Sequence, residues 1–338
     1  MDSKLRLPCG LFLSAASLSA ADPMHAVGDI FKPLGTPAER VADLSILTIV
    51  ICAAVFVVVA SLLAYAVIRF GYREGDSRSE PPQIYGSNQV EIAWTVIPIL
   101  IVFVLSMSAA RVTSAVQDQK MPKDALNITV VGHQWWWEFR YPDLNIVTAN
   151  EFHVPLSTVA LHKLTHLTLL SADVAHGFWI PQLSGKTDVI PNRTNTMWID
   201  PKEAGVYLGN CSEYCGTQHA RMELRVVVDT PEDFQKWVEL QKAHAAPASP
   251  QNQRAFLTGT CFACHTVNGT PARGKLGPDL THLMSRQTIV AAEVPNNAAN
   301  LREWIKDPQK MKPGNKMPTV KLNDAQVDQI AQYLTTLR

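Results

Sequence analysis

Two long apolar stretches restrict how this chain can fold more than any other feature of its sequence. Residues 44–68 and 92–110 contain no charged side chain, and Arg69 and Arg111 close them. About 20 apolar residues cross the hydrocarbon core of a bilayer, where only helices and closed barrels satisfy the backbone. The sequence therefore predicts a two-helix transmembrane hairpin, and Pro98 inside the second helix is compatible with it.

The flanking charges predict which side of the membrane each segment occupies. Basic residues and the apolar run 11–18 precede a small-residue stretch, so residues 1–22 are predicted to be a secretory signal peptide. The connection between the helices carries Arg69, Arg73 and Arg78, which favours the cytoplasmic side. Both termini are therefore expected on the periplasmic side of a bacterial inner membrane.

Beyond this N-terminal segment and hairpin, residues 23–115, the hydrophobic pattern changes. Short β-like runs bounded by Pro, Gly, Asn and Asp lie at 127–131, 166–170, 195–199, 205–208 and 222–228. Such spacing predicts an all-β sandwich or barrel over 116–245, with a helix from Pro231 to Ala246. An Ala/Pro/Ser linker at 246–251 then leads to 252–338, an expected all-α unit.

The charge balance gives no reason to expect a nucleic-acid partner. Lysine plus arginine number 30, as do aspartate plus glutamate. The C-terminal unit differs, because Arg254 to Arg338 contains 11 basic and 6 acidic residues. Four of the 6 cysteines lie in two close pairs, a spacing more typical of metal or cofactor attachment than of a disulfide framework.

The first pair belongs to a Cys-x3-Cys-x3-His-x2-Met motif made of Cys211, Cys215, His219 and Met222. Sulfur ligands mixed with imidazole favour copper, and a thioether is a weak axial copper ligand. A disulfide and a structural zinc site are the alternatives. A further imidazole would have to come from upstream, and the candidates are His133, His153, His162, His166 and His176. His176 lies in a small-residue turn from which a loop could direct it to the motif.

The second pair forms the Cys-x-x-Cys-His motif of covalent haem attachment, Cys261, Cys264 and His265. The two thiols would form thioethers with the haem, and the histidine would be the proximal iron ligand. Met317 lies in a proline-bounded loop and is the preferred sixth ligand, with Met284 and Met311 as competitors. No second cysteine pair or βαβ pattern supports a zinc or thioredoxin-like site here.

These features together resemble subunit II of haem–copper cytochrome c oxidases, and most closely the caa-type variant with a fused C-terminal cytochrome c domain. The resemblance covers essentially the whole chain and is carried by residues 90–95, 132–137, 184–191 and 211–222. It implies a multidomain protein: a transmembrane hairpin, a cupredoxin-like β-domain and a cytochrome c domain.

The resemblance also implies a binuclear copper A centre. Its ligands would be His176, Cys211, Glu213, Cys215, His219 and Met222. The two cysteines would bridge two copper ions and each histidine would bind one. The thioether and the backbone carbonyl of Glu213 would be weak ligands, while the Glu213 side chain would reach a magnesium ion at the interface with the large subunit.

Two further residues acquire roles from the resemblance. Trp135 matches the aromatic residue through which electrons enter copper A, although Trp136 stands where the family usually has tyrosine. A strand through this run would place Trp135 and Trp137 on one face, and ordinary core packing is the alternative for them. Glu91 matches the mouth of a proton channel, and its alternative is a solvated residue at the helix end.

The implied function is electron input to a respiratory terminal oxidase. Electrons would pass from haem c to copper A and on to the haem of subunit I, where oxygen is reduced to water with proton pumping. The expected partners are subunits I and III, membrane lipid and a periplasmic or membrane electron donor. A nitric oxide reductase subunit, a quinol oxidase subunit II and a free-standing membrane-tethered redox carrier are the alternatives.

Overall fold

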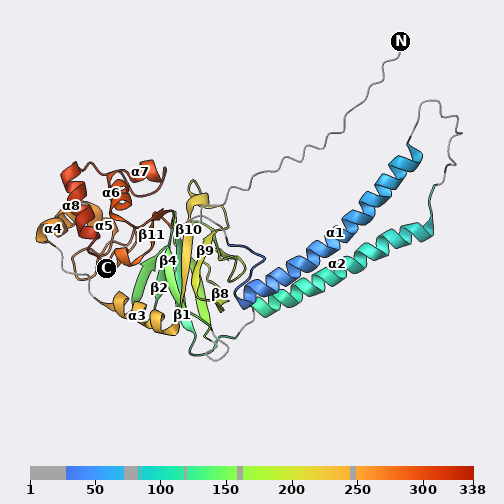
Figure 1. Ribbon diagram of the computed structural model, residues 1–338, viewed down its shortest axis with the longest axis horizontal. Coiled ribbons are helices and arrows are strands. Elements are labelled where there is room, and N and C mark those ends of the chain that lie inside the picture. Colours follow the sequence, from blue (N-terminus) through green and yellow to red (C-terminus); the bar gives the residue numbers. More distant parts are fainter. Residues whose placement is uncertain (1–27, 72–82, 84, 118–119, 158–162, 244–248) are drawn as a thin grey trace, which may run out of the picture.

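The computed structural model describes residues 28–71, 83, 85–117, 120–157, 163–243 and 249–338. Three parts follow one another: a pair of long helices, a β-sandwich and a C-terminal helical module, with the sandwich between the other two (Figure 1). The predicted signal peptide, residues 1–22, lies outside the described residues.

The two apolar stretches lie inside two long helices, α1 (Thr36–Phe70) and α2 (Asn88–Gln117). Both are long and apolar enough to cross a membrane, and their most apolar windows are not buried by the rest of the chain. At 1.5 Å per residue, α1 is about 52 Å long, which exceeds a hydrocarbon core of about 30 Å. The hairpin therefore protrudes beyond the bilayer.

The protruding end of the hairpin is fixed to the sandwich. Thr36, at the start of α1, donates hydrogen bonds from its backbone N and its Oγ1 to the Asp200 carboxylate, at 2.7 and 2.5 Å. The Trp198 indole donates to the backbone oxygen of Val116, near the end of α2, at 2.7 Å. The start of α1 and the end of α2 therefore lie on the same side as the sandwich.

The sandwich consists of two five-stranded sheets. Their orders are β3-β2-β1-β5-β8 and β4-β10-β9-β6-β7, with β1/β5 and β4/β10 parallel and the other neighbours antiparallel. The strands are β1 (Leu126–His133), β2 (Trp136–Tyr141), β3 (Ile146–Ala149), β4 (Glu151–Pro155), β5 (Thr165–Ser171), β6 (His176–Trp179), β7 (Thr187–Val189), β8 (Asn195–Ile199), β9 (Gly205–Cys211) and β10 (Glu223–Asp229). Helix α3 (Pro231–Lys242) begins at a Thr230 cap, and its last residue precedes the Ala246 predicted from the sequence.

Aromatic side chains from both sheets fill the core between them. Phe139 of β2 stacks on Phe152 of β4 with ring centroids 4.3 Å apart, and Trp137 meets Phe178 of β6 edge-on at 5.1 Å. All four are fully buried. Such burial of large rings is the main favourable contribution to the stability of the sandwich.

The tryptophan run does not form the continuous strand expected from the sequence. β1 ends at His133 and β2 begins at Trp136, so Trp135 lies in the turn of a hairpin. Trp137 alone is a core residue, while Trp135 and Trp136 are partly exposed. The alternation of side chains along a strand therefore does not determine on which face Trp135 lies.

The C-terminal module is helical apart from one two-stranded hairpin. Its elements are α4 (Pro250–Thr258), α5 (Cys261–Cys264), η2 (Leu283–Ser285), β11 (Thr288–Ile289), β12 (Val294–Pro295), α6 (Ala298–Lys306), α7 (Pro308–Met311) and α8 (Asp324–Leu334). Helix α8 packs against α4 and α6, and Phe256 meets Tyr333 at 5.3 Å. The module has its own apolar core, separate from that of the sandwich.

Candidate metal centre and cofactor cavity

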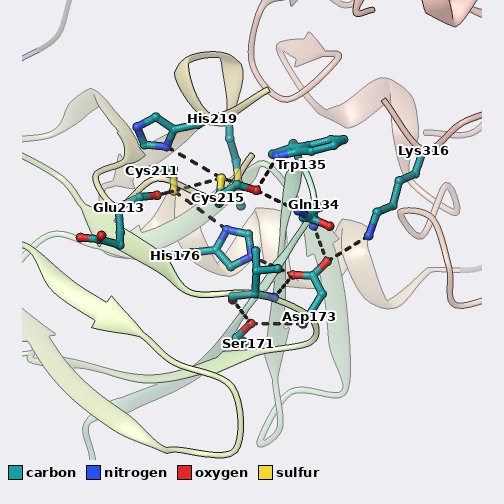
Figure 2. Close-up of polar contacts among 12 residues, drawn as sticks. Gln134, Trp135, Ser171, Asp173, His176, Cys211, Glu213, Cys215, His219 and Lys316 are labelled. Atoms are coloured by element: carbon teal, nitrogen blue, oxygen red, sulfur yellow. Dashed lines mark hydrogen bonds and ion pairs between the residues drawn. The ribbon is translucent and has the colours of Figure 1, made fainter. Parts of the chain in front are cut away.

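Sulfur and nitrogen donors surround the two cysteines of the first motif (Figure 2). The Cys211 and Cys215 sulfurs lie 3.6 Å apart. His176 Nδ1 is 3.9 Å from the Cys211 sulfur, and His219 Nδ1 is 3.8 Å from the Cys215 sulfur. The Met222 sulfur lies 3.8 Å from that of Cys215. This is a donor set for soft metal ions, in which each thiol has an imidazole of its own.

The sheet positions these donors more rigidly than the sequence indicated. His176 is the first residue of β6 and Cys211 the last of β9, so both stand on strand ends rather than within loops. The Ser212 N–H donates to the Gly177 carbonyl at 2.8 Å. A Cβ on Gly177 would lie 2.9 Å from the Glu213 nitrogen, so only glycine permits this close approach.

The geometry bears on two questions that the sequence left open: whether the cysteines form a disulfide, and which upstream histidine lies beside them. A sulfur separation of 3.6 Å is far beyond a disulfide bond of about 2.05 Å, and both thiols are free. His133 pairs with Glu138 at 3.1 Å and His153 with Asp229 at 2.6 Å, away from the thiols. Among the upstream histidines in the described part of the chain, the potential metal cluster contains His176; His162 lies outside that part.

Asp173 orients His176, and sequence reasoning missed it. Its Oδ1 accepts a hydrogen bond from His176 Nε2 at 2.9 Å, which leaves the Nδ1 lone pair directed toward the thiols. The same carboxylate accepts from the Gln134 backbone N–H at 2.7 Å. Its only signal in the sequence is an acidic residue three positions before a candidate ligand.

The two thiols depend on each other electrostatically. Their mutual hydrogen bond lowers the pKa of Cys211 to about 3, although burial opposes the shift. The same bond, together with burial, raises the pKa of Cys215 well above its ordinary range. A bound cation would replace the shared proton and hold both sulfurs as thiolates.

Glu213 divides into two functional parts. Its backbone oxygen lies 3.1 Å from the Cys211 sulfur, whereas its carboxylate is exposed and points away from the cluster (Figure 2). Met222 is fully buried under the site. The chain thus provides six potential donors, two of them thiolates, which is more than the four of a closed structural zinc site.

A cavity of about 650 Å³ lies between the second motif and the sandwich. One wall carries Cys261, Cys264 and His265, and Met317 lies on another. Met284 and Met311 are not among the lining residues and pack instead against the module core. Of the three candidate methionines, Met317 therefore has access to this space.

Two further residues make the cavity suitable for a haem. The carbonyl of Pro278 accepts a hydrogen bond from His265 Nδ1 at 2.8 Å, which leaves Nε2 as the ligand atom. Burial also lowers the pKa of His265 and keeps it neutral. Arg286 lines the cavity, and its buried Nε has no partner among the described residues. A buried guanidinium fits an anionic group such as a haem carboxylate.

Trp135 connects the two sites. It lines the cavity, and its indole N–H donates to the Cys215 carbonyl at 3.0 Å. Trp136 lines the same cavity but stacks on His133, with ring centroids 4.3 Å apart. Glu91 lies apart from both sites, exposed in the first turn of α2, near the end of the hairpin far from the sandwich (Figure 1).

Comparison with known proteins gives the same three-part division. The chain matches the family "Cytochrome C oxidase subunit II, transmembrane domain" over residues 29–112 and its "periplasmic domain" over 158–230. It matches "Cytochrome c" over 252–338. The chain is thus built as a membrane-anchored redox protein with a cupredoxin-like domain and a cytochrome c domain.

Named relatives make the assignment specific. The chain is 31% identical over 315 residues to cytochrome c oxidase subunit 2 of Alkalihalophilus pseudofirmus, covering 90% of each chain. It is 32% identical over 328 residues to that of Bacillus subtilis, covering 91% of each. A solved periplasmic domain of subunit II from Bradyrhizobium japonicum is 32% identical, with 36% of this chain and 97% of that one covered and a TM-score of 0.34.

The chain belongs to the cytochrome c oxidase subunit II family and carries a C-terminal cytochrome c domain. It is therefore an electron-transfer subunit of a respiratory oxidase complex, an oxidoreductase that includes subunit I. The family implies haem c and copper A as cofactors, and the donor sets described above fit both. Two membrane-spanning helices anchor it.

Proposed function

We propose that this chain accepts electrons at its cytochrome c domain and delivers them through the cupredoxin-like domain to the haem of subunit I. Oxygen is reduced to water there, with proton pumping. The observation that carries the proposal is the position of Trp135. It lines the cavity beside Cys261 and Cys264, and it donates a hydrogen bond to the carbonyl of Cys215.

Copper A is assigned to the cluster of the first motif. Cys211 and Cys215 would bridge two copper ions, with His176 and His219 each binding one. Met222 and the carbonyl of Glu213 would be weak ligands. Such a centre would supply one-electron transfer, with the charge of the electron shared between the two ions. The chain's own contribution is a buried, preformed set of donors.

Haem c is assigned to the cavity. Cys261 and Cys264 would hold it covalently, and His265 and Met317 would be the axial ligands, a pair that raises the haem potential. The Pro278 carbonyl fixes the His265 ring, and Asn315 accepts a hydrogen bond from the Met317 backbone N–H at 2.8 Å, which holds that loop.

Trp135 is proposed as the residue through which electrons enter the copper site. The contacts of its neighbours support this choice over Trp136 and Trp137. Trp137 is fully buried in the sandwich core, and Trp136 stacks on a histidine outside the copper loop. Trp135 contacts both the cavity and the backbone of a copper ligand.

The membrane geometry supports the remaining assignments. The sandwich and both cofactor sites are proposed to lie on the periplasmic side of a bacterial inner membrane. Glu91, at the other end of the hairpin, would then lie on the cytoplasmic side and serve proton uptake. The exposed Glu213 carboxylate would bind magnesium at the interface with subunit I. Subunit III, membrane lipid and a periplasmic or membrane donor complete the proposed partners.

The proposed division of the chain follows these functions. Residues 1–22 form a signal peptide, 23–115 the N-terminal segment and hairpin, and 116–245 the copper A domain. Residues 246–251 form a linker and 252–338 the cytochrome c domain. The separate hydrophobic cores on the two sides of residues 246–251 support this boundary.

Flash-induced reduction of the haem in the purified complex tests the path. Trp135→Phe removes the indole N–H, so it should slow electron transfer from haem to copper while both optical spectra stay unchanged. Trp136→Phe is the matched control on the same hairpin and should have little effect. Equal transfer rates in Trp135→Phe and the unmodified complex would contradict the proposed path.

A further inference from the structure

An ion cluster with a buried lysine and a buried glutamate joins the cytochrome c domain to the loop that carries the proposed copper ligands; its arginine is 41% exposed. Lys312, which is only 2% exposed, places its Nζ 2.8 Å from Glu293 Oε1. Arg221 pairs with the other Glu293 oxygen through Nη2, which also donates to the Met311 carbonyl at 2.7 Å. Arg221 comes from the sandwich side, immediately before Met222, whereas Lys312 and Glu293 come from the cytochrome c domain.

The lysine also donates hydrogen bonds to one carbonyl across the interface and one within its own domain. Its Nζ donates to the backbone oxygen of Arg221, and the Val290 oxygen lies within reach at 3.4 Å. A buried ammonium group without such partners would strongly destabilise the interface. Separating the two domains would therefore take the Arg221 carbonyl from Lys312 and the arginine from Glu293.

The segment that presents Glu293 has an unusual backbone. Val290, Ala291 and Ala292 have φ angles of 60°, 58° and 67°, the left-handed region that non-glycine residues rarely adopt. All three are buried in the turn between β11 and β12. Such a conformation persists where surrounding contacts determine it, and it is concentrated at functional positions. Here it directs Glu293 toward Arg221 and Lys312.

Further contacts surround the cluster. The Gln218 side chain donates to the Pro313 carbonyl, and Thr217 lies close to Gly314, where an added Cβ would be 3.2 Å from its methyl group. Lys316 pairs with Asp173 at 3.4 Å (Figure 2). The copper loop and the residues that orient it thus share one face with the cytochrome c domain.

We infer that Arg221, Glu293 and Lys312 form an intramolecular latch, which holds the cytochrome c domain on the copper loop in one orientation. The domain is then a fixed carrier of the second cofactor rather than a tethered shuttle. Buried ionic groups are well suited to fixing orientation, because a rotated interface would leave them unpaired. The consequence for electron transfer rests on the proposed function: electrons cross a permanent interface, and an external donor docks on another surface of the domain.

Cleavage of the linker tests the latch directly. A protease site is placed within residues 246–251 of the full chain in its complex with subunit I, and retention of the haem-stained domain is measured after cutting. The unmodified domain should stay bound. Lys312→Met and Glu293→Gln should each weaken retention at least about tenfold. The first removes the hydrogen bond to the Arg221 carbonyl, and the second leaves the buried Lys312 without a carboxylate partner. Lys310→Met, an exposed lysine two residues away, is the matched control and should change nothing.

Three additional measurements distinguish a broken latch from a misfolded domain or a loss of surface charge. Each variant must keep its covalent haem, which shows that the domain is folded. The double variant Lys312→Met/Glu293→Gln should lose less than the sum of the single losses, because the two residues act as one pair. Retention should also survive about 1 M salt, which screens exposed charges far more than buried ones.

Two results would overturn the latch: release of the unmodified domain on cutting, or retention of the Lys312→Met and control domains to the same degree. Retention is read without any redox chemistry. A chain that binds no copper would therefore refute the proposed function while leaving the latch standing.

Discussion

The two cofactor sites of this chain differ in how much of each the polypeptide builds by itself. At the proposed copper site, the sulfur and imidazole donors of Cys211, Cys215, His176 and His219 already lie within 4 Å of a neighbour, and His176 and Cys211 stand at the ends of strands β6 and β9. At the haem site, Cys261 and Met317 line a cavity of about 650 Å³. The donors of the proposed copper site are therefore preformed, whereas those of the proposed haem site line a large cavity.

The difference follows from the size of the cofactor. Two metal ions take up little space, so a packed sandwich can hold their ligands in place without them. A haem replaces a large part of a small domain's core, and without it the lining side chains lose their contact partners. We therefore expect the cytochrome c domain to depend on its cofactor for folding and the sandwich to fold without copper.

The largest expected effect comes from removing covalent haem. A cavity cost of about 24 cal/mol per Å³ over this volume reaches about 15 kcal/mol, as large as the whole stability of a domain, about 5–15 kcal/mol. The pair Cys261→Ala and Cys264→Ala should therefore abolish the haem stain and unfold the C-terminal domain, while the sandwich resists protease. Cys52→Ala, an exposed cysteine in α1, should leave both domains intact. A protease-resistant C-terminal domain without haem would contradict the expected dependence of this domain on its cofactor.

The second effect tests whether the sandwich core supports itself. Phe139→Ala removes a fully buried ring that stacks on Phe152, so it should lower the free energy of unfolding by about 3–5 kcal/mol. Val206→Ala, a partly exposed position on β9, should cost less than about 0.5 kcal/mol. Urea unfolding of the copper-free chain measures both. Similar losses in the two variants would mean that burial of Phe139 does not stabilise the copper-free sandwich.

The sequence predicted the chemistry of each site better than its placement. The spacing of Cys211, Cys215, His219 and Met222 indicated copper, because the residue type alone determines which donor atoms a side chain offers. His176 remained one of several candidates until the resemblance selected it, because pairing of β6 with β9 is a long-range contact. Asp173 was missed although it is local, because an acidic residue three positions before a histidine does not by itself indicate a hydrogen bond between them.

The turn at Trp135 shows a different limit. Aromatic residues favour strands, and nothing local in the run of three tryptophans indicates where the strand ends. Only the pairing of β1 with β2 places Trp135 in a hairpin turn beside the copper loop. By contrast, the membrane helices followed from local composition alone, because lipid imposes one solution on a long apolar stretch.

A third prediction concerns the hydrogen bond that orients the His176 imidazole. Asp173→Asn replaces the carboxylate that accepts from His176 Nε2, so copper affinity should fall about 10- to 100-fold, the usual effect of losing such a partner. Competition with a chelator measures the affinity. Asp188→Asn, at an exposed position of strand β7, is the control and should bind copper normally. Unchanged affinity in Asp173→Asn would show that the sheets alone fix the imidazole.

The smallest expected effect is a pH dependence within the sandwich. Burial lowers the pKa of His153, but hydrogen bonds to Asp229 and Glu151 outweigh it, and the pKa is raised above 6.5. Its stabilising contribution is complete below about pH 6.5 and is lost as pH rises through the folded-state value. His153→Gln should remove this pH-dependent part of the stability. Unfolding midpoints of both proteins between pH 5 and 9 should converge at high pH. A constant difference would contradict the assignment.

The central claim is that the preformed site holds a binuclear copper centre. Metal analysis combined with electron paramagnetic resonance of the purified protein tests it most directly. The expected result is two copper ions per chain and a mixed-valence signal delocalised over both nuclei, which Cys215→Ser abolishes. A signal from a single copper nucleus, or zinc in place of copper, would contradict the account.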